Sequence, residues 1–411
     1  MRVLGLPWAY WIVWVVVLVI AIGRFVPPLL ATYLTTDREL PASSAGLIIS
    51  VFGVGGVLSS LVGGYLADRY GHVPVVVWSQ AASAGALCLI ALELGHLALV
   101  AVLFAYGFSS HLANPALNAM IVGRVPPQDR ERAFTLNTWA LNLGFAVGPL
   151  CASWVAVRSF SLVFYLEAAL LLAAAIVVCL WLGRASVTRS DAIILTVPET
   201  LTTLRRDWVF LSFSLTMVAL MAVYLQAFTT LPMILAEEGL PVSFYGLLMA
   251  MNGGLLCLLS VPFVRVMDRI ANKTVLLHAG VLLIGAGYVV ELGADARWHH
   301  AVAMALWTLA ELAIFPVAWT IVSDLAPDRM LGTYLGVGGM YLAGGHVVAA
   351  GLGGTLLELV GPRGLHLVCL GVLVLVSVAF GLQSGGRRDR EQSGRDRALR
   401  RVVRPTPVPC P

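Results

Sequence analysis

Long apolar runs alternate with short polar segments along most of the chain. The runs are about 20 to 29 residues long, and apolar and polar positions do not alternate within them, so they predict helices rather than barrel strands. A helix crosses the hydrocarbon core of a bilayer in about 20 residues. The runs fall at residues 10–34, 44–67, 73–93, 96–122, 132–157, 159–183, 207–235, 242–267, 274–293, 299–324, 332–357 and 363–383. The pattern therefore predicts an all-α integral membrane protein with twelve transmembrane helices.

The composition agrees with a membrane environment. Of the 411 residues, 59% are hydrophobic and 12% are charged, whereas soluble proteins average about 25% charged residues. Such a chain has too few polar side chains to cover a surface in water. The six cysteines show no metal-binding spacing. These features exclude a disordered or nucleic-acid-binding chain, and we expect a lipid bilayer as partner, no nucleic acid and no metal.

Lysine and arginine are distributed unevenly between alternate loops. If the N-terminus is cytoplasmic, 21 of the 26 cationic residues lie in cytoplasmic segments, four lie in outer loops, and Arg24 lies inside the first span. Cytoplasmic loops of membrane proteins carry such an excess of positive charge. We therefore expect a multi-pass protein of the cell (plasma) membrane with both termini in the cytoplasm.

An internal repeat at an offset of 200 residues divides the chain into halves. Leu40-Pro41 recurs as Leu240-Pro241, and Asp68-Arg69 recurs as Asp268-Arg269. Parallel repeats of this kind are common in secondary transporters, where the substrate site lies between the halves. The expected divisions are an N-terminal six-helix bundle (1–183), a cytoplasmic linker (184–206), a C-terminal six-helix bundle (207–383) and a disordered, arginine-rich cytoplasmic tail (384–411).

The loop after the second predicted span combines an Asp-Arg pair with two glycines. Its residues are Gly64, Asp68, Arg69 and Gly71, with a degenerate copy at Asp268 and Arg269. Charges at a helix end can pair across the inner face, and a glycine permits a tight reversal. The loop resembles the Gly-x-x-x-Asp-Arg-x-Gly-Arg-Lys signature of the major facilitator superfamily, although His72 and Val73 replace the last two cations. The resemblance implies the fold of that family, with two pseudo-symmetric six-helix bundles, and a loop that latches the halves in the outward-facing state.

The fifth predicted span contains Gly144, Gly148 and Pro149. Glycines four residues apart let helices approach closely, and proline bends a helix. The spacing resembles the Gly-x-x-x-Gly-Pro motif of the superfamily's antiporters, which implies export, and the alternative is close packing alone. The family's arginine in the fourth span is absent, because Leu103 occupies its position.

Two ionisable residues lie deep inside predicted spans. Arg24 is in the first span and Glu311 is in the tenth, and charged groups at such depth are costly unless they are functional or paired. The family resemblance implies that the first, fourth, seventh and tenth spans line a central cavity. We expect Arg24 and Glu311 to face each other there, with Glu311 accepting a proton or a cationic substrate. The alternative is a fixed ion pair between the two helices.

Further polar and aromatic residues are candidates for the substrate or proton pathway. Amides, a tyrosine hydroxyl and indoles suit an amphipathic solute of medium size, and the alternative for each is a hydrogen bond between helices. These candidates are His111, Asn114, Asn118, Tyr224, Gln226, Asn252 and Trp307.

The motifs favour transport over catalysis. The sequence contains no nucleophile constellation, no phosphate-binding loop and no dinucleotide-binding glycine motif, so we expect neither an enzyme nor a cofactor. We predict a monomeric secondary transporter with alternating access, which exports a drug-like or metabolite compound in exchange for protons. The alternatives are uptake or facilitated diffusion of a sugar or organic ion, and a membrane sensor that does not transport.

Overall fold

The computed structural model describes residues 2–3, 5–92, 94–182, 204–267, 270, 272–327 and 330–403. Most of the predicted linker and the Asp268-Arg269 pair lie outside the described residues. Nearly all of the described chain is helical, as expected for a protein in lipid, where a helix satisfies its own backbone hydrogen bonds.

The first half begins with a short antiparallel strand pair and continues as helices. The strands are β1 (Arg2–Val3) and β2 (Leu6–Pro7). The helices are α1 (Trp8–Gly23), α2 (Val26–Thr32), the π-helix η1 (Tyr33–Asp37), α3 (Ala42–Tyr70), α4 (His72–Ile90), α5 (His96–Val122), the 3-10 helix η2 (Pro127–Asp129), α6 (Arg130–Ala156) and α7 (Phe160–Leu182).

The second half has closely similar boundaries. Its helices are α9 (Trp208–Tyr224), α10 (Gln226–Thr229), α11 (Leu231–Glu237), α12 (Val242–Met267), α13 (Lys273–Leu292), α14 (Arg297–Leu325) and α15 (Leu331–Val403). Within the described residues, eleven helical segments are long and apolar enough to span a membrane. The last of them, Tyr334–Gly385, has 52 residues and is divided at Gly361, whose φ of 70° is not helical. The described chain thus makes twelve passes, as predicted.

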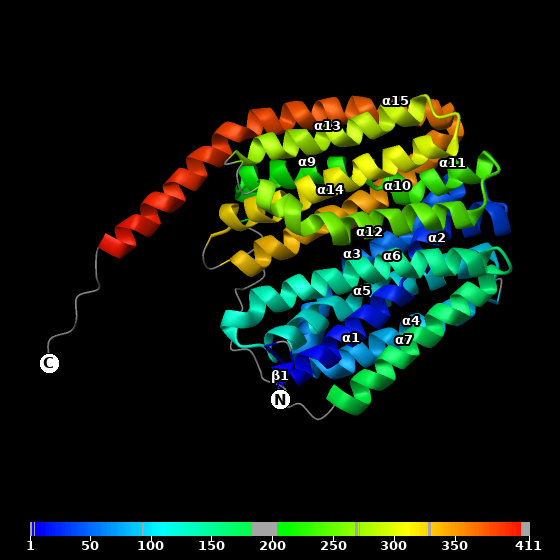
Figure 1. Cartoon of the computed structure of the whole chain (residues 1–411), viewed down its shortest axis with the longest axis horizontal. Coiled ribbons are helices and arrows are strands. Elements are labelled where there is room, and N and C mark those ends of the chain that lie inside the picture. The colour runs from blue at the N-terminus through cyan, green and yellow to red at the C-terminus, as the bar shows by residue number, and fades with distance from the viewer. Residues whose placement is uncertain are drawn as a thin grey trace.

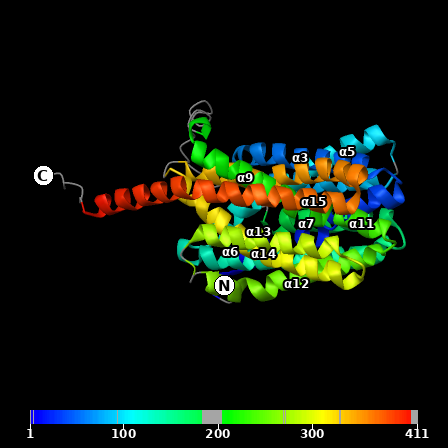
Figure 2. The same cartoon turned by 90° about the horizontal axis from the view of Figure 1, so that it is seen from above.

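The helices form two groups that run roughly along one direction. Figure 1 shows α1, α4, α5, α6 and α7 in one group and α9, α12, α13 and α14 in the other. Both termini lie toward the same end of the bundle in Figures 1 and 2. We call this the terminal end, and the opposite end the far end.

Two seams of closely packed helices join the halves, α3 against α15 and α6 against α12. In the first seam, a Cβ atom on Gly46 would overlap the Ala350 carbonyl oxygen, and one on Gly354 would overlap the Ala42 carbonyl oxygen. In the second, Gly246 lies against Ser153. Small residues permit this close approach of helices. The seams occupy the far-end parts of these helices, so the halves are in tight contact there.

Two hydrogen bonds cross the first seam. Glu358 of α15 accepts a bond from the Ser43 backbone N–H in the first turn of α3, at 3.0 Å. The Ser50 hydroxyl donates to the Val347 carbonyl at 2.8 Å and lies 3.0 Å from the Gly46 carbonyl of its own helix. The first of these bonds also places a carboxylate at the positive end of a helix dipole.

The first membrane pass is broken in its middle. α1 ends at Gly23, and α2 begins only at Val26. The carboxylate of Glu167 on α7 is fully buried and accepts hydrogen bonds from the backbone N–H groups of Phe25 (3.2 Å) and Val26 (2.8 Å), and from the Tyr106 hydroxyl. It therefore caps the start of α2, and the break leaves Arg24 on non-helical backbone.

The structure differs from the sequence-based expectation in the tail. α15 remains helical through Val403, whereas residues 384–411 were expected to be disordered. Arg, Glu, Gln and Ala in this segment have good helix propensity. A helix that continues from a membrane span also avoids the cost of nucleation.

Replacing Gly46 with Ala should destabilise the seam between α3 and α15. The added methyl group would meet backbone rather than a movable side chain, and overpacking of this kind costs about 1–3 kcal/mol. We expect the melting temperature of the purified protein, followed by tryptophan fluorescence, to fall by several degrees. Gly85→Ala is the matched control, because no atom lies within 4 Å of the added Cβ. Equal melting temperatures for both variants would contradict the close packing of α3 against α15 at Gly46.

Replacing Glu167 with Leu should destabilise the broken first pass. The change leaves two backbone N–H groups and the Tyr106 hydroxyl without their acceptor, and each unsatisfied buried group costs about 1–3 kcal/mol. We expect a large drop in melting temperature, and a smaller one for Glu167→Gln, which keeps an acceptor oxygen. Asp295→Asn, at an exposed position, serves as the control. A stable Glu167→Leu protein would rule out the capping role.

Candidate functional site

A cavity of about 410 Å³ lies between the two halves. Side chains from both halves form its wall, and we call it the central cavity. Its lining residues are Ala21, Arg24, Pro27, Pro28, Leu141, Asn142, Phe145, Tyr224, Leu225, Phe228, Asn252, Leu256, Glu311, Phe315, Leu342 and His346. The wall is mainly apolar and aromatic, with a few polar groups, as is typical of sites for small molecules.

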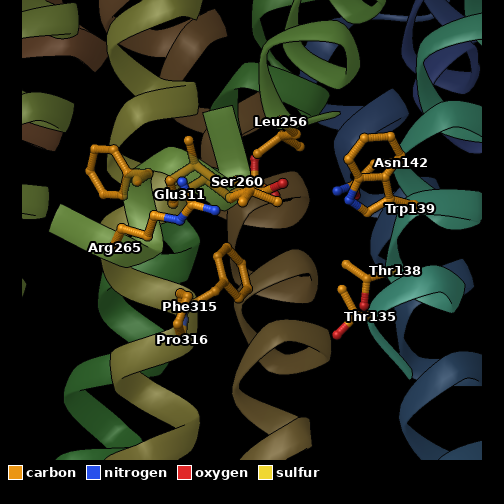
Figure 3. A pocket seen from close by; sticks show the side chains of 13 residues that line it. Thr135, Thr138, Trp139, Asn142, Leu256, Ser260, Arg265, Glu311, Phe315 and Pro316 are labelled. Atoms are coloured by element: carbon orange, nitrogen blue, oxygen red, sulfur yellow. The ribbon is translucent and has the colours of Figure 1, made fainter. Parts of the chain in front are cut away.

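A second cavity of about 550 Å³ adjoins the first. We call it the vestibule; it lies between α6, α12 and α14 (Figure 3). Thr135, near the start of α6, and Arg265, near the end of α12, line it, so it extends toward the terminal end. Its lining residues are Thr135, Thr138, Trp139, Asn142, Leu256, Ser260, Val261, Phe263, Arg265, Glu311, Leu312, Phe315 and Pro316. Asn142, Leu256, Glu311 and Phe315 line both cavities, so the two spaces are continuous.

Glu311 stands where the two cavities meet. The Tyr224 hydroxyl donates a hydrogen bond to its carboxylate at 2.5 Å. The amide nitrogen of Asn252 lies 3.4 Å from the same oxygen and 2.9 Å from the Thr308 hydroxyl, to which it donates. The carboxylate therefore has neutral donors around it, supplied by α9 and α12.

Arg24 lines the central cavity from the other half. Its guanidinium donates to the Asn114 side-chain oxygen at 3.2 Å and to the Ser110 carbonyl. Both Arg24 and Glu311 are on the cavity wall, yet no ion pair joins them within the described part of the chain. A fixed ion pair between them, the alternative raised by the sequence, is therefore absent from this structure.

Two of the candidate residues stabilise packing instead of lining the cavities. Gln226 is buried, and its amide donates to the Ala349 carbonyl of α15 at 3.2 Å. Trp307 is also buried, and its indole N–H donates to the Ile284 carbonyl at 3.1 Å. Each side chain fills the core with its body and satisfies a carbonyl with its polar tip.

The three candidates on α5 lie outside both cavity linings. His111 Nδ1 is 2.9 Å from the Gly107 carbonyl, and its ring meets the Phe52 ring edge-on. Asn114 accepts a hydrogen bond from Arg24. Asn118 is exposed. The structure thus brings together Arg24, Tyr224, Asn252 and Glu311 from the predicted set.

The glycines of the fifth pass pack helices against each other. Cβ atoms on Gly144 and Gly148 would overlap Ala21 and Ile22 of α1, just before the break at Arg24. Pro149 lies inside α6, and its carbonyl faces Gly246 of α12. Close helix packing, which is the alternative interpretation of this motif, accounts for these contacts.

The loop motif of the first half forms a tight turn. Gly71 has a φ of 92° and is the one residue between α3 and α4. Arg69 donates to the Tyr65 hydroxyl at 2.8 Å and lies over the Tyr70 ring. Gly64 belongs to α3, and the side chain of Asp68 lies outside the described positions.

Several lining residues could not be identified as cavity residues from the sequence. Phe145, Phe228 and Phe315 line the central cavity, but a phenylalanine inside a span is equally consistent with a buried core position and with a position that faces lipid. His346 also lines it, and Arg265 lines the vestibule from the terminal end of α12. Only the fold distinguishes these two from other polar residues in or beside a span.

Comparison with known proteins agrees with the geometry. The Na(+), Li(+), K(+)/H(+) antiporter of Planococcus maritimus is 28% identical over 361 residues, covering 78% of this chain and 83% of the antiporter. The multidrug resistance protein MdtH of Proteus mirabilis is 26% identical over 326 residues, covering 78% of this chain and 79% of MdtH. The crystal structure of a POT family transporter in complex with 5-aminolevulinic acid has the same fold, with a TM-score of 0.79 at 15% identity, covering 94% of this chain and 98% of that one.

The sequence profile of the Major Facilitator Superfamily matches residues 13–350. This range covers most of both six-helix halves and includes all of the predicted residues that line the central cavity. The chain therefore belongs to the Major Facilitator Superfamily and is a transporter of small-molecule substrates.

Proposed function

We propose that this transporter exports an amphipathic small molecule in exchange for protons. The observation that carries the proposal is the position of Glu311. It is the one carboxylate among the residues that line the two cavities, and only neutral groups donate hydrogen bonds to it. Ionisable groups at membrane depth commonly serve ion and proton pathways.

A single accessible carboxylate accounts for exchange. A proton and a positively charged group of the substrate compete for Glu311, so the transporter binds one or the other. The same residue then carries a proton in one direction and the substrate in the other. Phe145, Phe228 and Phe315 on the cavity wall suit the apolar part of the substrate.

The relatives and the charge pattern support the direction of transport. One relative is named as a cation/proton antiporter and another as a multidrug resistance protein. The excess of Lys and Arg in loops at the terminal end favours the cytoplasm for this end. The vestibule extends toward it, so we propose that the substrate enters from the cytoplasm.

Replacing Glu311 with Gln should abolish proton-coupled transport. The amide retains the shape of the side chain and its hydrogen bonds but cannot take up a proton. We expect ethidium added to acid-loaded proteoliposomes to collapse the pH gradient with the unchanged protein, as measured with a pH-sensitive acridine dye. Glu311→Gln proteoliposomes should match protein-free liposomes. Asp295→Asn, which removes an exposed carboxylate, should retain the activity.

Other outcomes of this experiment would contradict the proposal. Ethidium flux that is independent of the gradient and unchanged in Glu311→Gln would indicate facilitated diffusion. Binding without flux would indicate a sensor. Collapse of the gradient by NaCl, LiCl or KCl but not by ethidium would indicate an inorganic cation antiporter.

A further inference from the structure

Two oppositely charged side chains share the vestibule without pairing. Arg265 extends into it from α12, and Glu311 lines it from α14 (Figure 3). They are the two ionisable side chains among its lining residues. No ion pair joins them in the part of the chain that the structure describes.

Arg265 has unused hydrogen-bonding capacity in this space. Its guanidinium has five N–H donors, and among the described residues none of them meets an acceptor. The hydroxyl of Ser260, which lines the same wall, is buried and also lacks a partner. A guanidinium binds a carboxylate or phosphate through paired hydrogen bonds, so this part of the vestibule fits an anionic group.

The two charges favour one class of ligand. A purely cationic ligand would satisfy Glu311 and be repelled by Arg265, and a purely anionic ligand would have the opposite mismatch. A zwitterion satisfies both. Trp139, Phe263 and Phe315 provide apolar and aromatic surface in the same cavity, which suits an attached apolar body.

We propose that the substrate is a zwitterionic amphiphile, with its ammonium group at Glu311 and its anionic group at Arg265. This inference rests on the proposed function and specifies its substrate class. The ammonium group takes the position of the proton on Glu311, and the proton is released into the cytoplasm. Because a zwitterion has no net charge, each exchange for one proton moves one positive charge inward.

Three dansyl compounds with similar linkers separate the two charges. Nε-dansyl-lysine is zwitterionic, dansylcadaverine has only the amine, and dansyl-6-aminohexanoate has only the carboxylate. Trp139 lines the vestibule, so tryptophan-to-dansyl energy transfer reports binding to the protein in phosphatidylcholine nanodiscs. We expect dansyl-lysine to bind about tenfold more tightly than either singly charged compound, as a hydrogen-bonded charge would provide.

Replacing Arg265 with Gln should remove the preference for dansyl-lysine over dansylcadaverine, because that preference depends on the carboxylate of dansyl-lysine. We expect the affinity for dansyl-lysine to fall about tenfold, to that of dansylcadaverine, whose own affinity should not fall. Glu311→Gln should instead remove the advantage over dansyl-6-aminohexanoate. Arg206→Gln is the matched control, because Arg206 is exposed and lies outside both cavities.

A transport measurement provides a second readout. In proteoliposomes loaded with dansyl-lysine, protons should enter as dansyl-lysine leaves, so each exchange carries positive charge inward. A potassium diffusion potential that is negative inside should therefore accelerate this exchange. Exchange that does not respond to the potential would overturn the zwitterion assignment while leaving proton coupling intact.

The remaining outcomes are equally decisive. Equal affinity for dansyl-lysine and dansylcadaverine, or an equal loss for all three compounds in Arg265→Gln, would overturn the inference. Phosphatidylethanolamine is itself a zwitterionic amphiphile, so loss of dansyl-lysine binding when it is added would support the inference and identify a lipid as the source of the ligand. If dansyl-lysine binds as expected but no flux depends on a pH gradient, the substrate class stands and the proposed function fails.

Discussion

A helix break inside a membrane frees backbone N–H groups for which lipid offers no acceptor. The central cavity depends on how this chain solves that problem. Glu167 accepts hydrogen bonds from the two N–H groups that begin α2, which allows the first pass to break and to present Arg24 to the cavity. The seventh pass is interrupted at the corresponding place, around Leu225, and Gln226 ties its short helix α10 to α15. Each half therefore uses one buried polar side chain to hold an interruption beside the cavity.

Two seams close the far end of the space between the halves. Glycines bring α3 to α15 and α6 to α12 there. The vestibule lies between α6 and α12 toward the terminal end, where Thr135 and Arg265 line it. Closely packed helices thus lie toward one end and a polar passage lies toward the other, with Glu311 between them.

Features that arise from periodicity and length could be predicted from the sequence. The twelve passes and the broad division at the 200-residue repeat belong to this class, as does the depth of Arg24 and Glu311 within their spans. Side-chain orientation could not be predicted, because a polar residue in a span can face a cavity or satisfy a neighbouring carbonyl. Gln226 and Trp307 do the latter. The phenylalanines of the cavity wall have the same residue type as many core residues. They differ only in the direction in which their helix face points, which the sequence does not give.

The hydrogen bonds of the α3–α15 seam have a consequence for the exchange between states. Alternating access requires the far end to open, which separates α3 from α15 at Ser43 and Ser50. Ser50 would lose Val347 but still has the Gly46 carbonyl of its own helix within reach. Glu358 is exposed, so water can replace its bond to Ser43. Separating the two helices therefore leaves neither Ser50 nor Glu358 without a hydrogen-bond partner, and the loss of dispersion contacts between the glycine-lined surfaces adds to the cost.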